Sequence, residues 1–194
     1  MKEPSRSRAV TLTAVMAATA LLISIMKVEF PFYPLVYLKF DFAEVPSALT
    51  YMLAGPRWGY MCALVHYAGL LASRGDPLGP TMKFLAVASM LLGMQLARGR
   101  QRLSIVLGAL VRVLAMSVAN LLVVCVLFPS WLPIIRELLL TAGIRVGGWG
   151  DVLAAALLLT GVYNLLHTLL SVLPALLIVR EVRSRLGWPT SPLQ

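Results

Sequence analysis

The sequence predicts an all-α integral membrane protein: a compact bundle of six transmembrane helices in a single domain, residues 1–194, with both termini in the cytoplasm. Three observations support this fold class, namely the composition, the long apolar runs and the uneven distribution of basic residues. Hydrophobic residues make up 59% of the 194 positions and charged residues only 13%, and the mean hydropathy is +0.85. Because soluble domains carry roughly 25% charged residues, this composition indicates a bilayer environment.

The first apolar run, from Ala9 to Met26, contains no charged residue. At about 1.5 Å per residue this run nearly crosses a hydrocarbon core of about 30 Å. A signal peptide would place small residues after the apolar run, but here Ala18-Thr19-Ala20 lies inside it. We therefore expect a retained first transmembrane helix.

The later apolar runs follow one another along the whole chain and are separated by turn residues or charges. Gly55-Pro56, the stretch Gly75–Pro80 and the basic cluster Arg98–Arg102 mark the breaks. The second helix is too short to span the bilayer squarely, and the stretch Phe128–Asp151 has room for a short interfacial helix. The six expected helices cover approximately residues 9–27, 44–55, 58–73, 80–97, 103–127 and 152–180.

The distribution of charge predicts the orientation, because Lys and Arg accumulate on cytoplasmic segments. With the N-terminus inside, the cytoplasmic segments carry ten basic and two acidic residues, and the outer segments carry five basic and six acidic residues. The cytoplasmic residues are Lys2, Arg6, Arg8, Arg57, Arg98, Arg100, Arg102, Arg180, Arg183 and Arg185 against Glu3 and Glu181. This bias explains the net charge of +9 without a nucleic-acid partner.

Several chemistries lack their sequence motifs. No lysine follows a glycine, so the Gly-Lys-Ser/Thr element of a phosphate-binding loop is missing. The chain also lacks G-x-S-x-G and H-E-x-x-H, and Cys62 and Cys125 are isolated within predicted helices. We therefore expect no enzyme activity, no ATPase of its own, no metal and no cofactor.

A few polar side chains fall within the predicted helices, where each requires a partner or a role. Asn120 lies near the outer end of the fifth helix, and Asn164 and His167 share one face of the sixth. An amide suits the edge of a planar heterocycle with alternating carbonyl and imino groups. The alternative is that these residues only hydrogen-bond neighbouring helices, for about 0.6–2 kcal/mol each.

Three further polar residues have different expected positions. Arg112 is roughly 14 Å along the fifth helix from Leu103, and it could snorkel, pair with an acid or face a ligand. Lys83, near the outer end of the fourth helix, is expected to snorkel to the interface. His66, in the middle of the third helix, is expected to be a hydrogen-bonded packing residue outside the site.

The outer loop between the first two helices, Phe30–Pro46, is rich in aromatic residues and prolines. Such a loop can form an interfacial aromatic belt. Three features of the loop favour instead a folded lid over a pocket. They are its prolines, its alternating pattern of residues typical of an extended chain, and the charges of Lys39, Asp41 and Glu44.

At these residues the chain resembles the substrate-binding S-components of energy-coupling-factor (ECF) vitamin transporters, in particular the riboflavin-specific branch. The segment Tyr37–Pro46 is similar to that branch's loop into the second helix, and Leu53–Gly59 to its Gly-Pro turn into the third. Asn120 matches the asparagine of the fifth helix. Asn164 matches the Asn-x-x-Lys element of the sixth, with His167 in place of the lysine.

The resemblance implies a vitamin pocket near the outer face, and Leu38, Lys39, Asp41, Asn120, Asn164 and His167 are the candidate ligand-binding residues. It also implies delivery inward with a transmembrane coupling subunit and two ATPase subunits, in the plasma membrane of a prokaryote. Ala14 and Ala18 fit the spacing of residues that contact the coupling subunit. The expected ligand is riboflavin or a related flavin. The alternatives are another vitamin or heterocycle, or a membrane-embedded enzyme or assembly protein.

Overall fold

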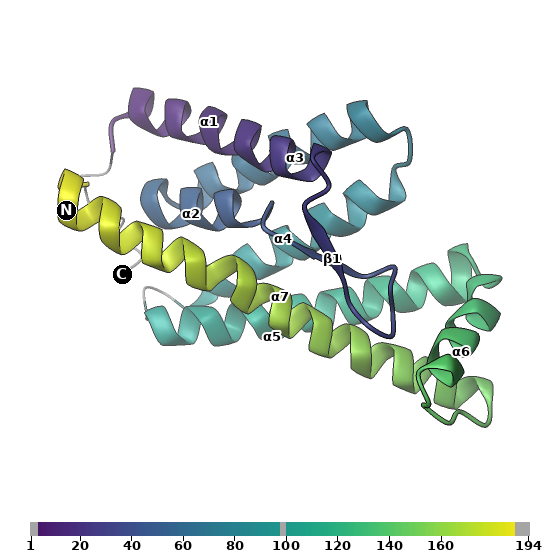
Figure 1. Ribbon diagram of the computed structural model, residues 1–194. Helices are drawn as coiled ribbons and strands as arrows, with labels where there is room; N and C mark the ends of the chain where they lie inside the picture. The colour runs from purple at the N-terminus through teal and green to yellow at the C-terminus, as the bar shows by residue number, and fades with distance from the viewer. Residues whose placement is uncertain (1–3, 98–99, 189–194) are drawn as a thin grey trace.

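The structure is a computed structural model that describes residues 4–97 and 100–188, and this part of the chain folds into a helical bundle with one β-hairpin (Figure 1). Lys2, Glu3 and Arg98, which entered the charge count, lie outside the described residues. The elements are α1 (Arg6–Ile25), β1 (Glu29–Pro31), β2 (Lys39–Asp41), α2 (Val45–Ala54), α3 (Pro56–Arg74), α4 (Leu78–Leu96), α5 (Gln101–Leu122), the π-helical turn η1 (Val123–Leu127), α6 (Trp131–Thr141) and α7 (Trp149–Leu186).

The six expected helices correspond to α1, α2, α3, α4, α5 with η1, and α7. The last helix extends beyond its expected range of 152–180 at both ends. Gly148 is its N-cap residue, and Gly187, in the left-handed conformation, is its C-cap residue. The stretch 128–151 contains the expected short helix, α6. The outer loop contains an antiparallel pair of short strands, in which Phe30 lies opposite Phe40.

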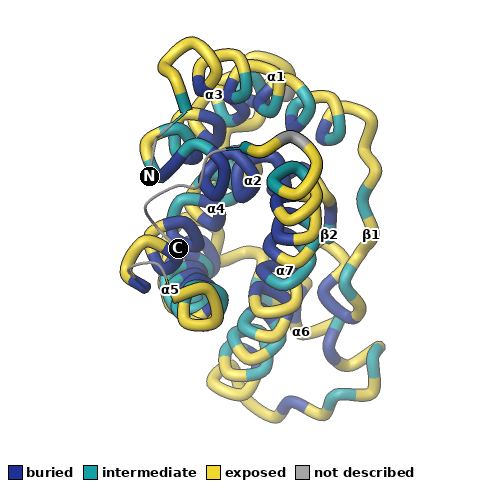
Figure 2. Tube along the Cα trace, turned by 90° about the vertical axis from the view of Figure 1, so that its left-hand side faces the viewer, coloured by how far each residue is buried: buried dark blue, intermediate teal, exposed yellow. Residues whose placement is uncertain are grey.

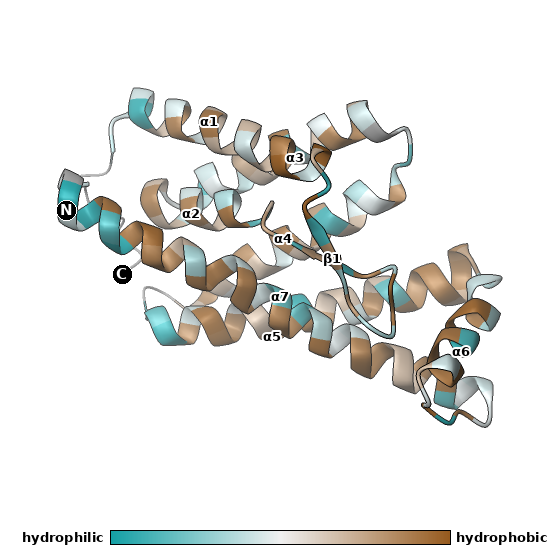
Figure 3. Cartoon of the chain, in the orientation of Figure 1, coloured by the Kyte–Doolittle hydropathy of each residue, from teal (hydrophilic) through white to brown (hydrophobic). Residues whose placement is uncertain are grey.

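The surface of the bundle has the character of a lipid-facing surface. Three helical segments of the described chain, Arg6–Ile25, Gln101–Leu127 and Trp149–Arg185, are long and apolar enough to cross a membrane. Figure 2 shows exposed residues along the helices, and Figure 3 shows that hydrophobic residues run through the same helices. Exposed large apolar residues recur most regularly along α5. There Val106, Leu110, Leu114 and Val118 recur every fourth residue with at least half of their surface exposed. Six crossings and the cytoplasmic position of the termini stay predictions.

Helix α2 forms the centre of the bundle. All residues from Val45 to Leu53 are buried, and the helix packs against α1, α3 and α7. Its last carbonyl groups, which have no partner within the helix, accept hydrogen bonds from the last turn of α7 and from Trp188, which follows α7. Arg183 Nη2 donates to Met52 O at 3.2 Å, and Trp188 Nε1 donates to Leu53 O at 3.0 Å.

A close backbone approach joins α4 and α5 at Gly93. A Cβ atom on Gly93 would lie 2.2 Å from Leu107 O and 2.7 Å from Gly108 Cα. Glycine is therefore required at position 93, and the two helices make the most extensive helix pair of the fold.

The two ends of the bundle differ. The start of α1 and the end of α7 lie at one end, whereas the β-hairpin, the α3–α4 connection and α6 lie toward the other (Figure 1). The second end therefore gathers the irregular parts of the chain, which is where a membrane bundle can form a site for a ligand.

Candidate ligand-binding site

A cavity of about 390 Å³ lies between the β-hairpin and the helices α4, α5 and α7. Its volume is in the usual range for small-molecule sites, about 300–1,000 Å³. All six candidate ligand-binding residues line it, although they come from the hairpin, α5 and α7. The lining residues are Glu29, Tyr37, Leu38, Lys39, Asp41, Glu44, Asp76, Leu78, Gly79, Met82, Lys83, Ala86, Arg112, Met116, Asn120, Val123, Trp131, Tyr163, Asn164 and His167.

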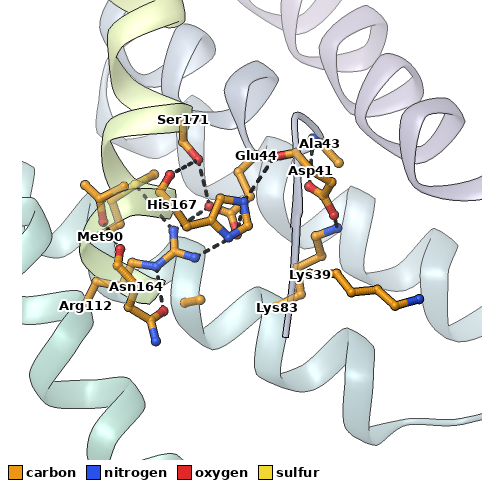
Figure 4. Close-up of polar contacts among 12 residues, drawn as sticks. Lys39, Asp41, Ala43, Glu44, Lys83, Met90, Arg112, Asn164, His167 and Ser171 are labelled. Carbon is orange, nitrogen blue, oxygen red and sulfur yellow. Dashed lines mark hydrogen bonds and ion pairs between the residues drawn. The ribbon is translucent and has the colours of Figure 1, made fainter. Parts of the chain in front are cut away.

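The deepest part of the cavity contains an ion pair between Arg112 of α5 and Glu44, which immediately precedes α2 (Figure 4). Both side chains are 1% exposed. Arg112 Nη2 donates to Glu44 Oε1 at 3.0 Å, Nη1 pairs with Oε2, and Ser171 Oγ donates to Oε2 at 3.0 Å. Because a guanidinium stays charged, burying it requires such a counter-ion. Of the three alternatives for Arg112, snorkelling is wrong, and the residue pairs with an acid while it lines the cavity.

Asn164 is bonded to the same arginine. Its Oδ1 accepts from Arg112 Nε at 3.0 Å, and its Nδ2 donates to Thr160 O at 2.9 Å. Because the first partner can only donate and the second can only accept, the two contacts agree on the orientation of the amide. Asn164 therefore takes part in interhelical bonding and also lines the cavity.

His167 and Tyr163 connect α7 to the second strand of the hairpin. His167 Nε2 is 3.1 Å from Asp41 O, and because a carbonyl only accepts, this nitrogen carries the hydrogen. Its Nδ1 lies 3.0 Å from the Tyr163 hydroxyl, which donates to Lys39 O at 2.6 Å. The Phe40 ring packs on Tyr163 with 4.8 Å between centroids. The hairpin is thus docked on α7 by two main-chain contacts and one ring contact.

Asp41 connects the hairpin to α4 on the opposite side. Its carboxylate pairs with Lys83 Nζ and accepts from Ala43 N at 2.9 Å. Lys83 also donates to Ser24 Oγ at 3.3 Å. The expectation that Lys83 snorkels was therefore wrong, because an acidic partner lies within reach. His66, as expected, is a packing residue outside this cavity, hydrogen-bonded to Ser24 at 3.0 Å.

The mouth of the cavity is more exposed. Lys39 pairs there with Glu29, and Tyr37 and Trp131 contribute aromatic rings. Tyr37 is 42% exposed, but its hydroxyl is partly removed from water, which raises the pKa of Tyr37 to about 12, so the phenol keeps its proton. Asn120 donates to Met116 O at 2.7 Å, one turn before the π-helical turn η1. π-helical turns are often found at functional sites.

Sequence reasoning missed the roles of Glu44, Tyr163 and Lys83. A signal for Glu44 was present, because a buried Arg112 requires an acid and Glu44 is next to the start of an apolar helix. Tyr163 gave no such signal, since an aromatic residue in a membrane helix is ordinary. The predicted partner residues Ala14 and Ala18 lie away from the cavity, exposed on one face of α1.

The described residues contain no group of three or more His, Cys, Asp or Glu side chains that could hold a metal ion. The cavity instead offers hydrogen-bonding groups at its base and aromatic and apolar side chains around them. Such a site can bind a flat polar ring and hold it, with no nucleophile or metal required.

The fold is shared with a protein of known structure. The chain superposes on a solved structure titled "Structure and mechanism of the S component of a bacterial ECF transporter" with a TM-score of 0.69. The superposition covers 94% of this chain and 99% of the other, at 24% sequence identity. At this identity the match establishes the fold, which is the S-component fold.

A particular relative is the riboflavin transporter RibU of Staphylococcus aureus (strain TCH60), which is 42% identical over 80 residues. The aligned region is 41% of this chain and spans 42% of the length of that relative. No family model matches the chain. Both similar proteins are transport proteins by name, and neither is named as an enzyme.

Proposed function

We propose that the chain is the substrate-binding S-component of an ECF-type importer and that it binds riboflavin or a related flavin at the outer face of the membrane. The observation that carries the proposal is that six residues chosen from the sequence surround one cavity in a chain with the S-component fold. The partial identity to a protein named as a riboflavin transporter supports the choice of flavin.

The chemistry of the cavity is suited to such a ligand. A flavin has a flat ring system with a polar imide edge and an uncharged polyol chain. Amide and guanidinium groups lie at the base of the cavity, and Tyr37, Trp131 and Tyr163 supply rings around it. Aromatic side chains of this kind stack on flat ligands.

Transport requires partners, which we propose to be a transmembrane coupling subunit and two ATPase subunits in the plasma membrane of a prokaryote. The chain lacks a phosphate-binding loop motif of its own. Ala14 and Ala18 are both exposed and lie one turn apart on α1. Small residues at this spacing permit close contact with a partner helix, so we assign the coupling contact to this face.

Purification in detergent tests the proposed ligand. A yellow preparation, or riboflavin fluorescence quenched at one equivalent of protein, supports flavin binding. A colourless, folded protein that leaves the fluorescence unchanged at micromolar riboflavin contradicts it, and a screen of other vitamins would then test the same fold with a different substrate.

A further inference from the structure

Arg112 has more hydrogen-bonding capacity than its partners use. A guanidinium carries five N–H groups in a planar arrangement. Nε–H goes to Asn164, one hydrogen of Nη1 and one of Nη2 go to Glu44, and the second Nη1 hydrogen faces Met90 Sδ at 3.8 Å. Among the described residues no acceptor takes the second hydrogen of Nη2.

The geometry of the group determines the direction of that remaining hydrogen. The Glu44 carboxylate accepts from the two hydrogens at the far end of the guanidinium, one on Nη1 and one on Nη2. The other Nη2 hydrogen is parallel to Nε–H, on the side of the group where Asn164 lies (Figure 4). The free donor of Arg112 is therefore next to the Asn164 amide.

Asn164 also keeps unused capacity. Its Nδ2 donates one of two hydrogens to Thr160 O, and its Oδ1 uses one of two lone pairs to accept from Arg112. One N–H and one lone pair remain, and both Asn164 and Arg112 line the cavity. Side by side, the two residues offer a donor, an acceptor and a donor.

We propose that Arg112 is a ligand-reading residue, whose free Nη2–H forms a donor–acceptor–donor row with Asn164 that recognises an imide edge, that is, carbonyl, N–H and carbonyl. This inference rests on the proposed flavin-binding function, and it assigns the pyrimidine edge of the ring to the base of the cavity. Glu44 has a supporting role. Its carboxylate neutralises the charge of Arg112 and accepts from the two far-end hydrogens of the guanidinium, so these two do not contact the ligand.

The test compares riboflavin with 3-methylriboflavin, in which a methyl group replaces the central imide hydrogen. The wild-type chain is expected to bind riboflavin more tightly by about 10- to 100-fold, the range for a lost hydrogen bond to a charged or buried group. Arg112→Lys keeps a cation for Glu44 but removes the free Nη2–H, which is the donor that Arg112 contributes to the row. It should weaken riboflavin binding by a similar factor and leave 3-methylriboflavin binding nearly unchanged.

Arg57→Lys is the matched control, because Arg57 is exposed near the start of α3 and away from the cavity; it should retain the wild-type ratio. If Arg112→Lys does not fold, the double variant Glu44→Gln with Arg112→Gln removes both buried charges together and should show the same loss of discrimination.

The outcomes separate the two proposals. Equal wild-type affinity for the two flavins, or an equal loss for both in the Arg112 variants, overturns the assignment of Arg112 and leaves flavin binding in place. A folded wild-type chain that binds neither compound overturns the proposed function and this inference together.

Discussion

At the scale of single residues, the two asparagines of the candidate site differ in the partners to which they hydrogen-bond within the protein. Within the described part of the chain, Asn120 hydrogen-bonds only to its own helix, whereas Asn164 is part of the buried Arg112–Glu44 cluster. Loss of the amide should therefore disturb the buried ion pair at position 164 and leave it intact at position 120.

Asn120→Ala and Asn164→Ala are expected to separate binding from stability. Both should weaken riboflavin binding by about 10-fold or more, because each removes a polar partner of a buried ligand. Only Asn164→Ala should also lower the unfolding temperature, since it leaves Arg112 Nε–H without an acceptor. Fluorescence titration and thermal unfolding in detergent measure the two effects. Normal binding by both variants would place the ligand site elsewhere.

His167→Lys tests the position at which the resemblance implies a lysine. The ammonium group keeps a donor near Asp41 O and lies beside Glu44, whose Oε1 is 3.7 Å from His167 Nε2. We expect preserved or tighter riboflavin binding in a fluorescence titration. A clear loss of affinity would show that the imidazole itself reads the ligand.

At the scale of elements, the hairpin is held between two helices: Lys83 of α4 pairs with Asp41, and Tyr163 and His167 of α7 bond its main chain. The sequence predicted a folded lid from composition, but it could not predict these anchors, because they join residues more than 40 positions apart. Phe30 and Tyr33 point outward, 58% and 68% exposed, so the same loop also has the exposed aromatic rings of a belt.

Tyr163→Phe is expected to loosen the hairpin with little change in its ring packing. The variant keeps the contact with Phe40 and loses the hydroxyl that donates to Lys39 O. Under the proposed function, riboflavin should dissociate about 5- to 10-fold faster, the effect of one neutral hydrogen bond of about 1 kcal/mol. Stopped-flow fluorescence measures the rate. Tyr67→Phe, which removes a hydroxyl bonded to Thr81 outside the cavity, should leave it unchanged.

Gly93→Ala is expected to separate α4 from α5, because its Cβ would lie 2.2 Å from the backbone oxygen of Leu107. Overpacking against a backbone atom costs about 3 kcal/mol, which corresponds to a fall of roughly 10 °C in the unfolding temperature. Gly161→Ala is the control, since its Cβ would make an ordinary contact at 3.6 Å with Val113. An unchanged unfolding temperature for Gly93→Ala would contradict the close packing.

At the scale of the whole molecule, composition and apolar runs were sufficient to predict the order and approximate limits of the helices. The boundaries shifted where local capping decided them, as at Gly148 and Gly187 of α7. Asn120, Asn164 and His167 were singled out from the sequence, because a bilayer makes a polar side chain conspicuous, and all three line the cavity. The pairing of Arg112 with Glu44, 68 residues apart, depended on packing that no local pattern contains.

The predicted orientation can be tested with cysteine labelling in a background in which the exposed Cys125 is replaced by Ser. Ser130→Cys precedes α6 at the cavity end, and Ser184→Cys lies in the last turns of α7; both positions are exposed. A membrane-impermeant thiol reagent should label the first in intact cells and the second only after permeabilisation. The reverse pattern would place the cavity on the cytoplasmic side.

The three ion pairs around the cavity, Arg112–Glu44, Lys83–Asp41 and Lys39–Glu29, have an electrical consequence. Moving one uncompensated elementary charge through 100 mV requires about 2.3 kcal/mol. In each pair the two charges cancel, so a movement of these side chains through the bilayer as pairs displaces no net charge. Under the proposed function and with an uncharged ligand, these three pairs would therefore add no voltage dependence to transport.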